Sequence, residues 1–181
     1  ALGADGFRLD VVDELPNEFV QLLKTHLRSI RPDALLMGEV WEDASNKIAY
    51  GQRRRYFVDG VLDSVMNYPF RTAILNFLRH HDDGRGLRET VCAIGENYPP
   101  QVLLCNMNLL GTHDTARILT AVMEDFQGSR EQRAKRHLSS RDLHTAKERL
   151  LLASVLQFML PGSPSIYYGD EAGMEGHQDP F

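Results

Sequence analysis

The chain has 181 residues, of which 43% are apolar, and a formal net charge of −5. This length suits one domain or part of a larger one, and the apolar share is enough to build a core. The negative charge argues against nucleic acid as the main partner, and no uncharged apolar run is long enough to cross a membrane. The first residues read ALGADG, without an initiator Met, and the last read DPF. We therefore expect a piece of a longer protein.

Apolar periodicity predicts strands that alternate with helices along the chain. The expected strands are residues 6–12, 34–40, 61–66, 102–110 and 165–168, and the expected helices are residues 16–30, 69–78, 87–94, 115–123 and 143–160. The basic run Arg53–Arg55 is interpreted as a solvated loop or helix surface, and residues 124–140 as a polar link. The last helix is apolar nearly all round from Leu150, so we expect it to be covered on several sides.

Polar side chains follow the apolar body of each expected strand. They are Asp10, Glu39, Asn67, the pair His113–Asp114 and the pair Asp170–Glu171. Strands separated by helices are expected to be parallel, and their carboxyl ends then share one face that carries the chemistry. Five strands of a (β/α)8 barrel fit the length, because a whole barrel takes about 250 residues. The alternative is an open doubly wound sheet, although no glycine-rich phosphate loop follows the first strand.

The first strand ends in charged residues. Arg8 and Asp10 stand two residues apart, so on a strand they point to the same face. Burying both costs several kcal/mol each unless they are paired and used. Asp10 is therefore the first candidate for a catalytic carboxylate, with Arg8 keeping it ionised. A structural ion pair at a strand end is the alternative interpretation.

Three carboxyl groups, those of Asp10, Glu39 and Asp114, are expected on one face. This predicts glycosyl transfer or hydrolysis, which needs a carboxylate nucleophile and a carboxylic acid in different surroundings. Arg8 accompanies Asp10, whereas Glu39 has apolar sequence neighbours, Trp41 among them. A metal site is a weaker interpretation, because the Arg8 guanidinium would repel a cation. We accordingly predict no metal ligands and no cofactor.

Four segments resemble signature segments of the α-amylase family of glycoside hydrolases, in the family's order. They are GFRLD at 6–10, GEVW at 38–41, LLGTHD at 109–114 and PGSPSIYYGDEAGMEG at 161–176. The form LGTHDTAR resembles the neopullulanase and cyclomaltodextrinase branch, and so does DVVDE at 10–14. That branch more often carries Asn at the position of Asp13.

The resemblance implies roles for individual residues. It implies a nucleophile at Asp10, a general acid and base at Glu39, a third carboxylate that stabilises the transition state at Asp114, an arginine that orients the nucleophile at Arg8, and a histidine that binds the sugar at His113. Two weaker candidates for substrate binding are Trp41, which could equally be a core residue, and Glu14, which could equally begin a helix. The retaining mechanism that these roles imply passes through a glycosyl-enzyme on the nucleophile.

The resemblance also implies what the whole protein does. The expected substrates are α-glucosidic linkages of starch-type saccharides (maltooligosaccharides, cyclodextrins and pullulan). Residues 1–181 would form barrel strands four to eight, without the first three strands, the small domain that protrudes after the third, or the C-terminal β-domain. We expect the chain alone to be weakly active or inactive, because its open edges expose apolar interior.

Other interpretations stay open at this stage. The first is a transglycosidase or a sucrose- or trehalose-processing enzyme of the same family. The second is a non-catalytic barrel scaffold, which would be expected to lose the three acids that this chain keeps. Calcium in the full-length protein and a homodimer are both compatible with the sequence. Cysteine usage and the resemblance predict a cytoplasmic protein.

Overall fold

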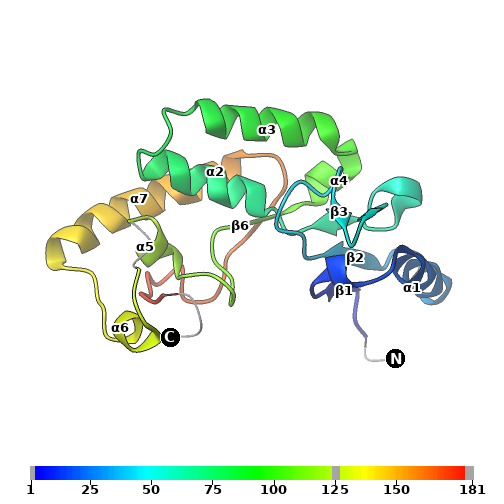
Figure 1. Ribbon diagram of the computed structural model, residues 1–181, viewed down its shortest axis with the longest axis horizontal. Helices are drawn as coiled ribbons and strands as arrows, with labels where there is room; N and C mark the ends of the chain where they lie inside the picture. The colour runs from blue at the N-terminus through cyan, green and yellow to red at the C-terminus, as the bar shows by residue number, and fades with distance from the viewer. Residues whose placement is uncertain (1–2, 124–126, 178–181) are drawn as a thin grey trace. The chain divides into compact units, whose positions relative to one another are not determined.

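The computed structural model describes residues 3–123 and 127–177 of the chain (Figure 1). The chain divides into two compact units. Unit 1 comprises Ala1–Pro69, Val91–Met107 and Pro161–Ser163, and unit 2 comprises Phe70–Thr90, Asn108–Leu160 and Pro164–Phe181. None of the helices in the described ranges has the length and apolar content that crossing a bilayer requires.

A three-stranded parallel sheet in unit 1 has the strand order β1–β2–β5. The strands are β1 (Gly6–Leu9), β2 (Leu35–Gly38) and β5 (Ser64–Val65), each shorter than expected. The register pairs Leu9 with Gly38, so β1 and β2 end side by side. The predicted α/β class with parallel strands is confirmed, and the register brings the residues after β1 and β2 together.

Helix α1 (Asn17–Ile30) connects β1 to β2 (Figure 1). The sequence predicted the start almost correctly, because Pro16 caps the helix. The buried positions of α1 are Val20 and Lys24, whereas Leu22 and Ile30 of the predicted apolar face are exposed. The prediction failed because Lys24 fills a core position, where its ammonium group finds oxygen partners from neighbouring segments.

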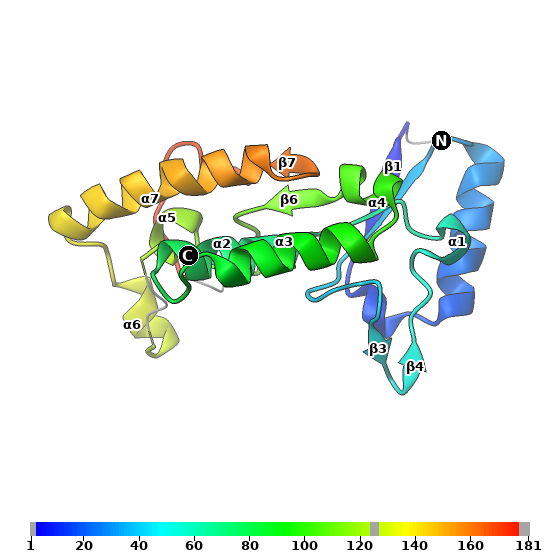
Figure 2. The same ribbon diagram turned by 90° about the horizontal axis from the view of Figure 1, so that it is seen from above.

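A short hairpin follows β2, formed by β3 (Ile48–Ala49) and β4 (Gln52–Arg53) (Figure 2). Its two-residue turn has positive φ at both Tyr50 (54°) and Gly51 (71°). Two positive φ angles are the property of the type I′ turn, which matches the twist of paired strands. A 3-10 turn (Val58–Gly60) then leads to β5. The interpretation of Arg53–Arg55 as a solvated loop or helix surface holds for the exposed Arg55, but Arg53 lies in β4 and Arg54 is buried.

The strand predicted at 102–110 was also partly wrong. Residues Pro100–Cys105 form helix α4, and only Met107–Leu109 form strand β6. A proline at the first helical position favours helix formation, because it has no N–H to satisfy there. A parallel bridge joins Met66 to Met107, and β6 pairs with β7 (Ser163–Ser165), two residues earlier than predicted.

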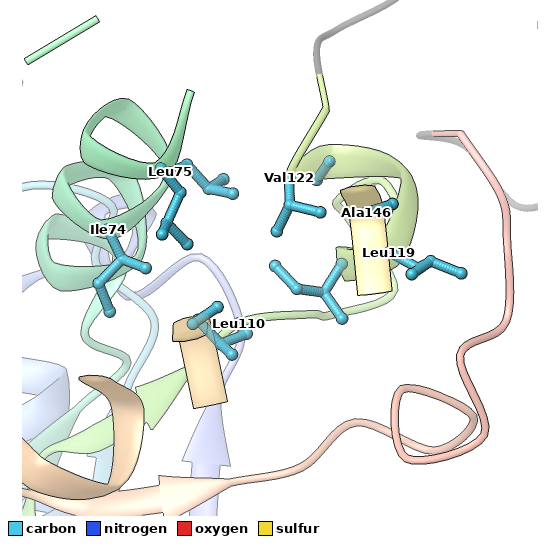
Figure 3. Packing of buried hydrophobic residues seen from close by; sticks show 10 residues of the cluster. Ile74, Leu75, Leu110, Leu119, Val122 and Ala146 are labelled. Atoms are coloured by element: carbon cyan, nitrogen blue, oxygen red, sulfur yellow. The ribbon is translucent and has the colours of Figure 1, made fainter. Parts of the chain in front are cut away.

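Helices dominate unit 2. They include most of α2 (Tyr68–Leu78), the first part of α3 (Arg85–Asn97), α5 (Ile118–Ala121), α6 (Arg130–Ala134) and α7 (Ser140–Met159). Helix α6 lies in the region predicted as a polar link and begins with a capping box between Ser129 and Gln132. Side chains of α2, α5 and α7 meet in one hydrophobic core, in which Ile74, Leu119 and Ala146 are buried (Figure 3).

One face of α7 differs from expectation. Ala146 and Ala153 are buried, but Leu151, Val155 and Met159 are exposed, with 70%, 58% and 78% of their surface accessible. The apolar character of the helix after Leu150 predicted cover on several sides. In unit 2, other residues cover only the side of α7 that carries Ala146 and Ala153.

Candidate active site

The guanidinium group of Arg8 binds two carboxylates at the carboxyl ends of β1 and β2. Its Nη1 lies 2.5 Å from Asp10 Oδ1, and its Nη2 lies 2.9 Å from Glu39 Oε2. Its Nε lies 3.4 Å from the Met66 sulfur, which fixes the plane of the fork. The planar fork of arginine suits this arrangement, because it can hold two oxygens in set directions. The prediction that Arg8 pairs with Asp10 is confirmed, and Glu39 joins the same pair.

The two carboxyl groups that share Arg8 have different surroundings. The Asp10 side chain is 69% exposed, whereas the Glu39 side chain is 4% exposed. Glu39 accepts hydrogen bonds from the Val11 backbone N–H at 2.9 Å and from Trp41 Nε1 at 3.0 Å, besides its contact with Arg8. The apolar setting predicted for Glu39 is therefore incomplete: the group is buried, and three donors hold it in place.

The backbone at Val11 has an unusual conformation. Its φ and ψ are 39° and 52°, in the left-handed region. A β-branched residue rarely adopts this region, and such residues cost about 1–3 kcal/mol unless their surroundings determine them. The left-handed residue ends the strand immediately after Asp10 and leads into the 3-10 turn Val12–Glu14. Its N–H points at Glu39, so the turn after one carboxylate helps to position the other.

Trp41 contributes to the Glu39 site in a way that the sequence did not specify. Its ring stacks on the ring of Tyr68, with centroids 3.9 Å apart and planes 11° apart. Tyr68 is almost fully buried, whereas Trp41 is 43% exposed. The indole thus anchors its N–H on Glu39 while part of it faces solvent. The sugar-stacking role of Trp41 stays a prediction.

The turn after Asp10 is also held from the hairpin side. The carboxylate of Asp13 accepts a hydrogen bond from Tyr56 Oη and lies 3.1 Å from Lys47 Nζ. The buried Arg54 donates to the backbone oxygens of Asp13 and Leu15. We call Lys47, Arg54 and Tyr56 the clasp. The clasp could not be predicted from the sequence, because its partners lie 34 to 43 residues apart and both Arg54 hydrogen bonds go to backbone oxygens.

Glu14, the other candidate in this turn, is exposed and accepts a hydrogen bond from Tyr50 Oη at the hairpin tip. This carboxylate raises the pKa of the Tyr50 hydroxyl, because the hydrogen bond favours the protonated phenol. The proposed contact of Glu14 with substrate stays a prediction. The alternative interpretation that Glu14 begins a helix is wrong, because Glu14 is the last residue of the 3-10 turn and α1 begins at Asn17.

His113 and Asp114 belong to unit 2, in the loop after β6. His113 Nε2 lies 3.1 Å from Asp114 Oδ2, and the two side chains are 61% and 40% exposed. The loop is stabilised by threonines: Asp114 N donates to Thr112 Oγ1 at 3.2 Å, and Thr112 N donates to Thr115 Oγ1 at 3.0 Å. The adjacent pair can present an anion and an imidazole to the same ligand.

A second carboxyl group, that of Asp170, lies against this loop. Asp170 is buried, and burial raises its pKa to about 6 even though Arg117 nearby opposes the shift. A side chain on Gly111 would overlap the Asp170 carboxylate, so the loop approaches it closely. The guanidinium of Arg117 lies over the ring of Tyr168, 4.4 Å from its centroid. Asp170 was noted in the sequence only as a polar residue at a strand end.

The structure thus brings Arg8, Asp10, Glu39 and Trp41 together in unit 1, and His113 with Asp114 in unit 2. Across residues 3–123 and 127–177, no three His, Cys, Asp or Glu side chains are grouped so that they could hold a metal ion. Calcium in the whole protein stays a prediction that these residues do not test.

Comparison with known proteins gives a consistent result. Residues 1–180 match the family described as alpha amylase, catalytic domain. The chain is 38% identical to an amylopullulanase of Thermoanaerobacter thermohydrosulfuricus over 99% of its length, which is 12% of that protein. It is 34% identical to a cyclomaltodextrinase of a Bacillus species over 98% of its length, which is 27% of that protein.

Solved structures agree with these relatives. The cyclic alpha-maltosyl-(1→6)-maltose hydrolase of Arthrobacter globiformis superimposes with a TM-score of 0.76 and 28% identity. The match covers 98% of this chain and 34% of that one. The chain therefore spans a minor part of the relatives that it matches.

Proposed function

The chain belongs to the α-amylase family of glycoside hydrolases, and from this premise we propose that the protein containing it is a retaining glycoside hydrolase. Its substrates would be α-glucosidic linkages of starch-type saccharides such as maltooligosaccharides, cyclodextrins and pullulan. The names of the relatives, amylopullulanase and cyclomaltodextrinase among them, support this substrate class. The observation that carries the proposal is the Arg8 guanidinium shared by an exposed Asp10 and a buried Glu39.

In this proposal Asp10 is the nucleophile and Glu39 is the general acid. Asp10 would attack the anomeric carbon while Glu39 gives a proton to the leaving oxygen, and water would then hydrolyse the glycosyl-enzyme with Glu39 acting as base. The exposure of Asp10 suits a group that must reach a sugar carbon. The donors around Glu39 suit a group that must hold one position through both steps.

Asp114 would supply the third negative charge of the site. Positive charge develops on the sugar ring at the transition state, and a fixed carboxylate stabilises it. His113, whose side chain contacts Asp114, would donate a hydrogen bond to the same sugar. Trp41 and Glu14 would contribute further contacts to substrate from the ends of β2 and β1.

We further infer that residues 1–181 are barrel strands four to eight with their helices, within a larger catalytic domain. In support, β1 is an edge strand of the three-stranded sheet, and its Phe7 is 52% exposed. Apolar side chains on an open sheet edge favour pairing with further strands. The chain alone would therefore be weakly active or inactive.

Compartment and assembly are proposals of the same kind. Both cysteines, Cys92 and Cys105, are free and exposed, which suits a reducing compartment, and we infer the cytoplasm. The homodimer stays a prediction.

Trapping the glycosyl-enzyme tests the function and the role of Asp10 together. The whole protein would be treated with a fluorinated α-glucosyl fluoride, which slows the second step of a retaining glycosidase, and then digested for mass spectrometry. We expect one added glycosyl group on the peptide that contains Asp10, and none in Asp10→Asn. Hydrolysis of maltooligosaccharides should fall by at least about 10⁴-fold in that variant.

A label on another carboxylate would contradict the assignment of Asp10. A protein that neither hydrolyses the substrates nor takes up the label would contradict the function itself. Product analysis on maltose and sucrose separates hydrolysis from glycosyl transfer, since a hydrolase releases mainly monosaccharides and a transferase mainly longer saccharides.

A further inference from the structure

The residues that follow Asp10 are held more firmly than a solvated turn requires. We propose that Asp13 is a positioning residue: bound by the clasp of Lys47, Arg54 and Tyr56, it fixes the turn that presents the Val11 N–H to Glu39. The inference rests on the proposed function for the role of Glu39 alone. The proposal gives the β3–β4 hairpin and the segment after it a role in positioning the carboxyl group of Glu39.

Val11 has a backbone conformation that its own side chain does not stabilise. Its left-handed backbone is unfavourable for a β-branched residue, and a side chain that is 52% exposed provides little packing to compensate. Some other part of the structure must determine this conformation. Val12, the next residue, is fully buried, so it fixes one end of the turn.

Asp13 fixes the other end of the turn. Its side chain is 23% exposed, with Tyr56 Oη and Lys47 Nζ bound to the carboxylate. Tyr56 is 2% exposed, so its hydroxyl is a rigid donor. Burial raises the pKa of Tyr56 and the hydrogen bond to Asp13 raises it further, so the phenol stays protonated and continues to donate.

Arg54 closes the clasp on the backbone. Its Nη1 donates to Leu15 O at 2.9 Å, and its Nη2 donates to Asp13 O. Arg54 is 5% exposed, and a buried guanidinium needs such acceptors. Carbonyl groups on both sides of Glu14 are thus tied to one rigid group, and the turn from Val11 to Leu15 has little freedom to relax.

If Asp13 bound substrate directly, its surroundings would have to be different. A subsite carboxylate needs acceptor oxygens turned to solvent, whereas each oxygen of Asp13 already has a partner: Oδ1 binds Tyr56 and Oδ2 binds Lys47. The structure therefore favours positioning. A positioning residue should affect the rate constant kcat, and a subsite residue should affect KM.

Tyr56→Phe tests the clasp, because it removes one hydroxyl and keeps the buried ring. Tyr98→Phe is the matched control: Tyr98 is 4% exposed and also in unit 1, but its hydroxyl accepts from Ala44 N at 2.9 Å and does not contact the turn. Hydrogen exchange at the Val11 amide of the whole protein should accelerate about tenfold in Tyr56→Phe and stay unchanged in Tyr98→Phe.

Kinetics provide the second readout. With maltooligosaccharides, Tyr56→Phe should lower kcat about tenfold with KM nearly constant, because a displaced acid costs rate rather than binding. Asp13→Ala should lose more, Asp13→Asn should recover part of that loss by still accepting from Tyr56, and the double variant Asp13→Ala/Tyr56→Phe should lose no more than Asp13→Ala alone.

The two readouts fail separately. Equal exchange at Val11 in the wild type and Tyr56→Phe, or equal acceleration in both Tyr variants, would overturn the clasp and leave the proposed function intact. A raised KM with constant kcat in Asp13→Ala would also overturn it, in favour of a subsite role. If the wild type proves not to be a glycosidase, the exchange experiment still decides whether the clasp holds the turn.

Discussion

The two ends of the three-stranded sheet in unit 1 carry ionic clusters of opposite design. At the amino ends of the strands, the buried Lys24 meets Asp63, and each has further backbone partners: Lys24 Nζ donates to Ala34 O at 3.3 Å, and Asp63 accepts from Leu36 N at 2.7 Å. At the carboxyl ends, one cation, Arg8, meets the two carboxylates of Asp10 and Glu39.

The two clusters differ in their ratio of cations to carboxyl groups and in how far those groups are exposed to solvent. Lys24 is 2% exposed and has a carboxylate partner for its single charge, which is how a buried ion is tolerated. The Arg8 cluster instead sets two carboxyl groups around one guanidinium, and Asp10 within it is open to solvent. A buried cation held by a close carboxylate stabilises a fold, whereas carboxyl groups that outnumber their cation and open to solvent are suited to a cationic transition state. This contrast shows how one sheet could be stable at one end and, in the proposed function, reactive at the other.

Among changes at the two ends of the sheet, Arg8→Lys should have the largest effect on activity. An ammonium group cannot hold two carboxylates in the fixed directions of a guanidinium fork, so Asp10 and Glu39 would separate. We expect kcat/KM of the whole protein to fall about 100-fold with little loss of stability. Steady-state kinetics on maltooligosaccharides and thermal unfolding measure the two quantities.

Arg31→Lys is the matched control for this change. Arg31 also contacts two carboxylates, those of Asp5 at 2.5 Å and Asp33 at 3.2 Å, but it lies at the amino ends of the strands, and both partners are largely exposed. Its kcat/KM should equal that of the wild type. A similar loss of activity in both variants would remove the distinction between the two ends of the sheet.

Lys24→Met should have the larger effect on stability. It leaves the Asp63 carboxylate without its main partner, so we expect the free energy of unfolding to fall by about 3 kcal/mol. Arg28→Met removes a second cation, 3.7 Å from the same carboxylate but 48% exposed, and should cost less than about 1 kcal/mol. Urea denaturation of the three proteins checks the order. Equal losses would mean that burial does not set the strength of these pairs.

The sequence predicted the carboxyl end of the sheet better than the amino end. Arg8 and Asp10 share a strand face, and the parallel register places Glu39 beside them, so periodicity and topology were sufficient. Lys24 lies among apolar positions of α1, and its burial depends on Asp63, which is 39 residues away. The helical residues at 102–105 were misread because a short apolar run has no period that separates a strand from a helix.

The clasp shows the limit of such predictions most clearly. Its hairpin has strands of two residues, too short for any alternation to be seen, and a Tyr-Gly turn in place of the usual Asn-Gly. The run Arg53–Arg55 is uniformly basic in sequence. Only the fold separates the buried Arg54 from its exposed neighbours on either side.

The smallest expected effect is on the stability of unit 2. It contains two aspartates, Asp170 and Asp82, whose pKa values are shifted in opposite directions. Burial raises the pKa of Asp170 from 3.8 to about 6, so between these values the folded protein binds a proton that the unfolded chain releases. The free energy of unfolding should therefore fall as pH rises through this window. Asp170→Asn removes the penalty of the buried charge, and we expect about 1 kcal/mol of added stability at pH 7 and little change near pH 4.

Asp82 sharpens this contrast. Hydrogen bonds from the backbone N–H groups of Gly86 and Leu87 lower its pKa, so its contribution to stability is present above pH 3.8 and is lost as the pH falls through the lowered value. Asp82→Asn should therefore destabilise the protein at pH 7, where Asp170→Asn stabilises it. Thermal unfolding of both variants from pH 3 to 7 measures the two signs. A destabilising Asp170→Asn at pH 7 would show that its carboxylate supports the 111–114 loop as an ion, in spite of its burial.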